Sequence, residues 1–139
     1  MNHDAPLQLK NDLAELDNVG RFVEEMGKRH HLPLAVVRAV GLSLDEIVTN
    51  VITHGYDDHD RHDIQIRLTV QGDEVVTEVE DDGRPFNPLE LPDADTTSSL
   101  EDRPVGGLGI HLVKCLMDHV EYRRTEGRNL LITRKKMTA

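Results

Sequence analysis

Residues 64–81 read IQIRLTVQGDEVVTEVED, and the pattern in this stretch predicts an antiparallel sheet. Apolar residues alternate with polar ones along both halves, as they do in half-buried β-strands. A glycine-containing tripeptide at 71–73 separates the halves, so the two strands should form a hairpin. Asp81 falls on the same face of the second strand as Val75, Thr77 and Val79. We therefore expect a hairpin whose buried face ends in a carboxylate.

Two amphipathic helices should precede this hairpin. From about residue 12 to residue 30, apolar residues recur at spacings of three and four, and Asp12 with Glu15 forms a capping-box pattern at the start. Residues from about 33 to 54 repeat the same spacing after Pro33, a residue that suits the first turn of a helix.

A long connection, a third helix and a second hairpin should follow. Residues 82–105 contain four prolines and many polar residues, a length and composition usual for a lid, a binding loop or a disordered segment. A helix should run from about 106 to 118, and strands at 120–125 and 129–135 should close the chain, with a further short strand at 7–9. This order predicts an α+β two-layer sandwich, with helices packed on one face of a mixed, mainly antiparallel sheet.

The length and composition narrow the possible functions. The 139 residues fit one domain, 1–139, and 16 Lys and Arg against 26 Asp and Glu give a net charge of −10. We therefore expect no direct contact with nucleic acid. Cys115 should be a small core residue of the third helix. With neither a signal peptide nor a membrane-spanning stretch visible, we expect a cytoplasmic protein that does not enter a membrane.

Glu46 and Asn50 form the first candidate functional pair. They lie four residues apart on the second predicted helix, beside its apolar stripe, so both side chains can enter one cavity. A carboxylate can accept a proton, and an amide oxygen can bind a hard cation without adding charge. Taken alone, two polar residues at this spacing are more often a solvated helix face.

Asp81 begins the second candidate cluster, DDGRP at 81–85. A buried carboxylate needs hydrogen-bond donors, which a ligand amino group and an ordered water would supply. Gly83 would let a flat ring approach the backbone. The alternative is an aspartate that caps a turn at the end of a strand.

The third candidate is the glycine-rich stretch GGLG at 106–109, which leads into the third predicted helix. The free N–H groups and positive dipole at a helix N-terminus favour phosphate oxygens. Such a stretch is weak evidence alone, and no Gly-Lys-Ser/Thr follows it, so it is not a Walker A sequence.

The three clusters, taken in order, resemble the N, G1 and G2 boxes of the superfamily of gyrase, heat-shock chaperone, histidine-kinase and MutL ATPases (GHKL), which share the Bergerat ATP-binding fold. The matching stretches are DEIVTNVITHGY at 45–56, DDGRPFNP at 81–88 and GGLGIHLV at 106–113, and the resemblance covers about residues 7 to 135. Within the superfamily, the short length and the form DDGRPFNP resemble the anti-sigma-factor serine/threonine-protein kinases.

The resemblance implies that the chain binds ATP and Mg²⁺, and it implies a role for each matched residue. Asn50 matches the asparagine that binds magnesium, and Glu46 matches the acidic residue that acts as general base. Asp81 matches the aspartate that hydrogen-bonds the adenine amino group, and Gly83 matches the glycine beside the ring.

The resemblance also implies a mobile ATP lid at about residues 84–105. Gly107 and Gly109 match the phosphate-side glycines at the hinge of that lid. Pro85 stands where the superfamily usually has a second glycine, a departure that the short anti-sigma kinases share.

For function, the resemblance implies a kinase that binds a sigma factor and phosphorylates an anti-sigma-factor antagonist. It also implies a homodimeric state. Two alternatives stand beside it. One is a nucleotide-gated protein-binding module without phosphotransfer. The other is the catalytic fragment of a histidine kinase, which would need a phospho-accepting helical hairpin that this sequence does not show.

Overall fold

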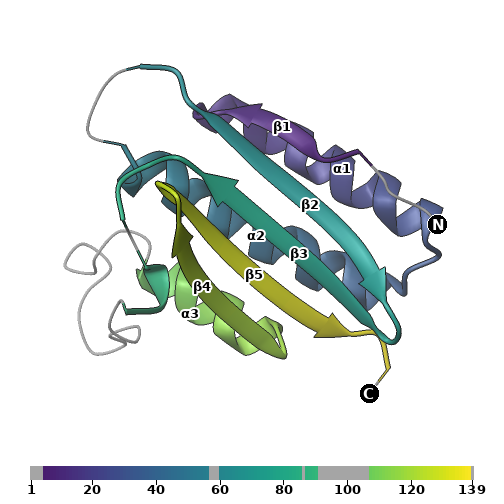
Figure 1. The fold of residues 1–139 in the computed structure, drawn as a ribbon. Coiled ribbons are helices and arrows are strands. Elements are labelled where there is room, and N and C mark those ends of the chain that lie inside the picture. Colours follow the sequence, from purple (N-terminus) through teal and green to yellow (C-terminus); the bar gives the residue numbers. More distant parts are fainter. Residues whose placement is uncertain (1–4, 57–59, 86, 91–106, 139) are drawn as a thin grey trace.

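The computed structural model describes residues 5–56, 60–85, 87–90 and 107–138, and at residues 90 and 107–109 it describes the backbone alone. Figure 1 shows the elements in chain order. They are β1 (Leu7–Lys10), the 3-10 helix η1 (Leu13–Glu15), α1 (Leu16–Arg29), α2 (Leu34–His54), β2 (Asp63–Gln71), β3 (Glu74–Asp81), the 3-10 helix η2 (Pro88–Glu90), α3 (Gly107–Leu116), β4 (His119–Thr125) and β5 (Arg128–Lys136).

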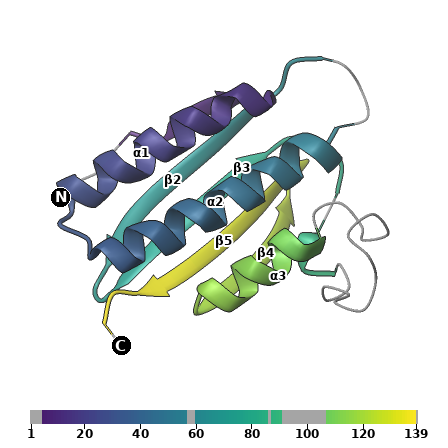
Figure 2. The same cartoon turned by 180° about the vertical axis from the view of Figure 1, so that it is seen from behind.

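The strands form one sheet in the order β1-β2-β3-β5-β4, and each of the four pairings in the described chain is antiparallel. The three α-helices lie side by side on one face of this sheet (Figure 2). The predicted two-layer α+β sandwich is therefore confirmed, and the described strands contain no parallel pair.

β3 lies in the middle of the sheet, between β2 and β5. The register places Asp81 opposite Ile64 on one side and Asn129 on the other. Asp81 is buried, as are the residues at alternate positions before it, Val75, Thr77 and Val79. The predicted buried face of the hairpin, with a carboxylate at its end, is confirmed.

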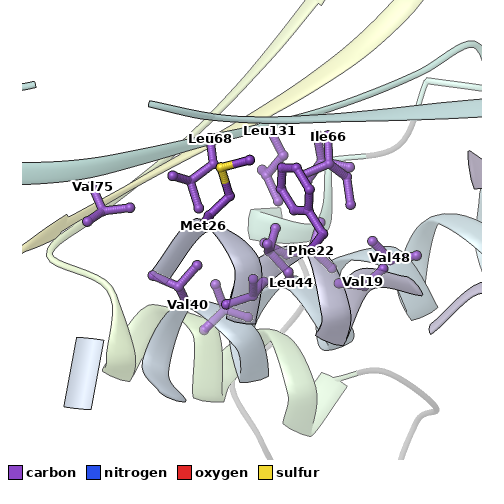
Figure 3. Packing of buried hydrophobic residues seen from close by; sticks show 14 of the residues in the cluster. Val19, Phe22, Met26, Val40, Leu44, Val48, Ile66, Leu68, Val75 and Leu131 are labelled. Carbon is purple, nitrogen blue, oxygen red and sulfur yellow. The ribbon is translucent and has the colours of Figure 1, made fainter. Parts of the chain in front are cut away.

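The hydrophobic core fills the space between the sheet and the helices (Figure 3). α1 and α2 contribute apolar side chains that pack against those of the sheet: Val19, Phe22, Met26, Val40, Leu44 and Val48 from the helices, and Ile66, Leu68, Val75 and Leu131 from the strands. Full burial of a side chain of this size stabilises a fold by about 1.5–3 kcal/mol. The core therefore holds α2 firmly against the middle of the sheet.

The start of the first helix differs from the predicted capping box. Asp12 accepts the N–H of Ala14 and caps η1, while α1 itself begins at Leu16. The Glu15 carboxylate accepts the N–H of Lys10 at 2.6 Å instead of that of Asp12. Because β1 is an edge strand that leads straight into this turn, the N–H at its end is a donor that needs a partner.

The prediction that Cys115 is a core residue is wrong. Cys115 is exposed on α3, with its Sγ 3.7 Å from Nε2 of His111. α3 turns Ile110 and Val113 towards the interior, and both are buried. The spacing of apolar residues predicted the helix correctly. Because this short helix has apolar residues on several sides, the spacing alone could not show which side packs against the rest of the protein.

Most of the predicted lid at 84–105 lies outside the described residues, and its hinge motion stays a prediction. Within the described part, Pro88–Glu90 forms a single 3-10 turn. The described helices include none that is both long enough and apolar enough to cross a membrane.

Candidate functional site

The C-terminal end of α2, the end of β3 and the start of β5 lie together at one end of the molecule (Figure 1). Residues from these elements line a pocket. The empty space at this pocket is about 370 Å³ when the open solvent at its mouth is included. Its polar lining residues are Asn50, Asp81, Tyr122 and Asn129. The others are apolar side chains and a glycine: Ile47, Val51, Gly55, Val79, Pro88 and Leu131.

Asp81 is the acidic residue of this pocket, and only 4% of it is exposed. Its Oδ1 accepts the backbone N–H of Gly83 at 2.8 Å and an amide N–H of Asn129 at 3.0 Å. Its Oδ2 accepts no hydrogen bond from the described residues. Burial raises the pKa of the Asp81 carboxyl above its ordinary value near 3.8, while the hydrogen bonds from Asn129 and Gly83 oppose that rise.

Asn129 connects Asp81 to the neighbouring strand. Its Nδ2 donates to Asp81 Oδ1 and, at 2.8 Å, to the carbonyl oxygen of Arg84. Its Oδ1 accepts the hydroxyl of Tyr122 and, at 3.1 Å, Nη1 of Arg124. Arg124 also donates from Nη1 to the carbonyl oxygen of Gly83 at 2.8 Å, which ties β4 to the turn after β3.

The sequence analysis missed Asn129, Tyr122 and Arg124. One signal was present, because Asn129 shares the inward parity of Leu131 and Thr133 on the last predicted strand. A polar residue on an apolar face requires a partner. The sequence did not indicate that this partner is Asp81, because β3 and β5 are separated along the chain by the long connection and α3.

Asn50 carries an unpaired acceptor in the pocket. It is 3% exposed, and its Nδ2 donates to the backbone carbonyl of Glu46 at 2.8 Å. Its Oδ1 is buried and has no hydrogen-bond partner among the described residues. Leaving such an atom unsatisfied costs about 1–3 kcal/mol. An amide oxygen is a suitable ligand for Mg²⁺, which commonly takes one or two protein ligands and completes its shell with phosphate and water oxygens.

Glu46 does not accompany Asn50 into the pocket. It is half-buried on α2 and is not among the lining residues in the described part of the chain. Residues four apart on a helix differ in direction by about 40°, enough to turn one side chain away from a narrow pocket. The described pocket therefore contains Asn50 without Glu46, and both the shared cavity and the role of Glu46 as general base stay predictions.

Gly83 packs against the end of α2. A Cβ on residue 83 would collide with the carbonyl oxygen of Gly55. The same oxygen accepts the N–H of Arg84 at 2.8 Å, and Nε of Arg84 donates to the carbonyl oxygen of His54 at 2.7 Å. The turn after β3 thus satisfies the last carbonyl groups of α2. Gly83 is not among the described lining residues, so its place beside a ring stays a prediction.

Gly107 and Gly109 lie in the first turn of α3, which begins at Gly107, close to the predicted start. The first N–H groups of a helix have no partner within it and favour an anion. The role of Gly107 and Gly109 beside a phosphate group stays a prediction. The structure therefore brings two of the predicted site residues, Asn50 and Asp81, into one described pocket and adds Asn129 and Tyr122 to them.

Comparisons with known proteins agree with this geometry. Residues 9–135 match the family described as the histidine kinase-like ATPase domain. Serine-protein kinase RsbW of Listeria monocytogenes serotype 4a (strain HCC23) is 26% identical over 125 residues, which cover 86% of this chain and 80% of that protein. Serine/threonine-protein kinase BtrW of Bordetella bronchiseptica (strain ATCC BAA-588 / NCTC 13252 / RB50) is 28% identical over 90 residues, which cover 65% of this chain and 63% of that protein.

A solved structure shares the fold. The crystal structure of the RsbU and RsbW domains of a Mycobacterium tuberculosis protein superposes with a TM-score of 0.66 at 13% identity. The match covers 96% of this chain and 32% of that one, so this chain spans about a third of its structural neighbour.

Proposed function

This chain belongs to the histidine kinase-like ATPase domain family, and we propose that it is an ATP-dependent serine/threonine-protein kinase of the anti-sigma class. It binds a sigma factor and phosphorylates an anti-sigma-factor antagonist. Its similarity to proteins named serine-protein kinase RsbW and serine/threonine-protein kinase BtrW supports this proposal. The observation that carries it is the presence of two oxygen acceptors, from Asp81 and Asn50, in one pocket whose other lining residues are mostly apolar.

The pocket suits an adenine ring. Apolar side chains such as Val79 and Leu131 line it, and apolar walls with a few polar groups are typical of sites for small ligands. The Oδ2 atom of Asp81 is available to accept a hydrogen bond. The exocyclic amino group of adenine is a donor of the required kind. Asp81 therefore recognises the base.

Asn50 holds the metal ion. Its Oδ1 is buried, unpaired among the described residues and carried by α2, one of the helices packed on the sheet. An Mg²⁺ ion held there would neutralise part of the negative charge of the ATP phosphates. Because the amide adds no charge of its own, Asn50 ligates the ion without weakening its attraction for the phosphates.

Glu46 is the proposed general base. It lies one turn before Asn50 on α2 and accepts the proton of the attacking hydroxyl of serine or threonine. The hydroxyl oxygen forms a bond to the γ-phosphorus while the bond from that phosphorus to the bridging oxygen of ADP breaks. ADP leaves with the electron pair of the broken bond, and the proton stays on Glu46.

A nucleotide-gated binding module without phosphotransfer is the second candidate. The observation that favours it is the absence of Glu46 from the described lining of the pocket. Such a module would use Asp81 and Asn50 in the same way and would bind its partner only with nucleotide present. The two candidates differ in whether phosphate leaves the nucleotide.

A transfer experiment tests the proposal. The purified protein is incubated with ATP labelled at the γ-phosphate, Mg²⁺ and an extract of the source cells, and labelled proteins are identified by mass spectrometry. We expect label on a serine or threonine of a small antagonist protein, dependent on Asn50. Calorimetric binding of ATP without any transfer would favour the gated module, and no binding at all would contradict both candidates. The proposed homodimer is tested separately by sedimentation.

A further inference from the structure

Asn129 makes every hydrogen bond that an amide side chain can make. Its two N–H groups donate to Asp81 Oδ1 and to the Arg84 carbonyl, and its oxygen accepts from Tyr122 and Arg124. A guanidinium can only donate and a backbone carbonyl can only accept, so the orientation of the amide is unambiguous. The residue is 5% exposed, and a buried side chain whose donors and acceptors are all satisfied is held rigidly.

This network determines which oxygen of Asp81 remains for a ligand. Oδ1 already accepts two N–H groups, from Gly83 and Asn129, so it stays an acceptor within the protein. A proton bound to the carboxyl would therefore sit on Oδ2 and change that atom from an acceptor to a donor. The ionised carboxylate therefore offers the pocket a much stronger acceptor than the protonated carboxyl does.

We propose that Asn129 is a positioning residue for nucleotide binding: it holds Asp81 ionised and orients it so that Oδ2 accepts the amino group of adenine. Tyr122 and Arg124 hold Asn129 in turn, through its amide oxygen. This inference rests on the proposed function for its ligand. It assigns a residue outside the three sequence motifs to the adenine site.

Several groups around Asp81 affect its pKa, and Asn129 is one of them. Burial has the largest effect on the pKa of Asp81 and raises it. Asp82, directly after β3, also raises this pKa, and Arg124 on β4 lowers it. Tyr122 is the other titratable residue of the pocket, while the lining residues from α2 carry no charge. Among the interactions that lower the pKa of Asp81, the hydrogen bond from Asn129 has the largest effect. Its loss should therefore raise this pKa further.

The first experiment needs no nucleotide. The Asp81 carboxyl is titrated by carbon-13 NMR in the wild type and in Asn129→Leu, with the signal assigned from Asp81→Asn. We expect an upward shift of about one pH unit in Asn129→Leu, since a hydrogen bond to a charged group is lost. Asn129→Thr retains a hydroxyl donor and should recover part of the shift. Thr133→Val removes a buried polar group from the same face of β5 and should cause none.

The second experiment measures ATP affinity against pH by calorimetry. ATP affinity should begin to fall at a higher pH in Asn129→Leu than in the wild type. On the acid limb of the profile the variant should bind ATP about tenfold more weakly, and this difference in affinity should shrink at alkaline pH. ATP itself titrates identically with both proteins, so the difference reports on the protein. A purely structural defect would lower the affinity by the same factor at every pH and would overturn the proposal.

The outcomes separate this inference from the proposed function. If the wild type binds no ATP, the proposed function fails, and the nucleotide-free titration still decides whether Asn129 controls Asp81. An unshifted titration in folded Asn129→Leu, or an equal shift in Thr133→Val, overturns the inference. If Asn129→Leu does not fold, Tyr122→Phe replaces it: a smaller shift in the same direction is expected, and no shift contradicts the proposal.

Discussion

The backbone N–H of Arg84 donates to the carbonyl oxygen of Gly55 at 2.8 Å and joins the turn after β3 to the end of α2. The glycine before it, Gly83, has no room for a side chain because of the same carbonyl group. Asp81 stands at the end of β3, and Asn50 lies in the last turns of α2. This junction therefore helps to set the distance between the two proposed ligand-binding side chains.

Gly83→Ala should lower the free energy of unfolding by about 1–3 kcal/mol, because the added methyl group meets backbone that cannot move aside easily. Gly20→Ala is the matched control. Gly20 is exposed on α1 and nothing would contact its Cβ, so this change should raise stability by about 0.5–1 kcal/mol. Urea unfolding measures both. Equal effects of the two substitutions would contradict the close packing at residue 83.

Asp81→Asn should make the nucleotide-free protein more stable than the wild type at neutral pH. Burial raises the pKa of Asp81 in the folded state, so the wild type is most stable below the ordinary pKa near 3.8 and loses stability as pH rises through the folded-state value. The advantage of Asp81→Asn should therefore appear above about pH 4 and then level off. Thermal unfolding over a pH series measures it. An advantage that is the same at every pH would contradict the raised pKa.

Asn50→Ala should abolish the Mg²⁺-dependent part of ATP binding without lowering stability. Removal of a buried, unpaired oxygen and the better helix propensity of alanine should raise the free energy of unfolding by up to about 1 kcal/mol. Ser43→Ala is the control, since Ser43 is also buried on α2 with an unpaired oxygen among the described residues and does not line the pocket. It should show the stability effect alone. Loss of Mg²⁺-dependent binding in Ser43→Ala would argue against a specific role for Asn50.

Glu46→Gln should keep ATP affinity and slow phosphotransfer by about 10²–10⁴, because the amide cannot accept the substrate proton. Asp45→Asn changes the adjacent half-buried carboxylate and should transfer at close to the wild-type rate. Single-turnover transfer of the γ-phosphate, with affinity measured in parallel, distinguishes the two. Wild-type transfer by Glu46→Gln would remove the proposed base and favour the nucleotide-gated module.

Inosine triphosphate should bind about 100-fold more weakly than ATP, because its 6-oxo group would place an acceptor against the Asp81 carboxylate. The two ligands differ in polar groups only at and beside this position of the base. Asp81→Asn can present an N–H to the pocket while its oxygen keeps the bonds to Gly83 and Asn129, so it should remove or reverse the preference. Competition calorimetry tests this, and an unchanged preference in Asp81→Asn would exclude Asp81 as the base-reading residue.

The features that followed from sequence are those set by local periodicity. Alternation placed Asp81 on the buried face of β3, and spacings of three and four located the helices, because backbone geometry repeats at these periods whatever the rest of the fold does. The resemblance of the three motifs supplied Asn50 and Asp81 as candidates. Both lie in the described pocket.

The features that sequence left open depend on contacts between distant segments. Asp81 meets Asn129 only because β5 returns beside β3 after the long connection, and no local pattern specifies that register. The same holds for Gly83, whose neighbour is the end of α2, and for Glu46 and Cys115, whose directions depend on which side of a helix the sheet covers. Periodicity in the sequence shows which residues share a face of a helix or strand. Which other element packs on that face depends on the close packing of the whole core, so it cannot be read from one segment alone.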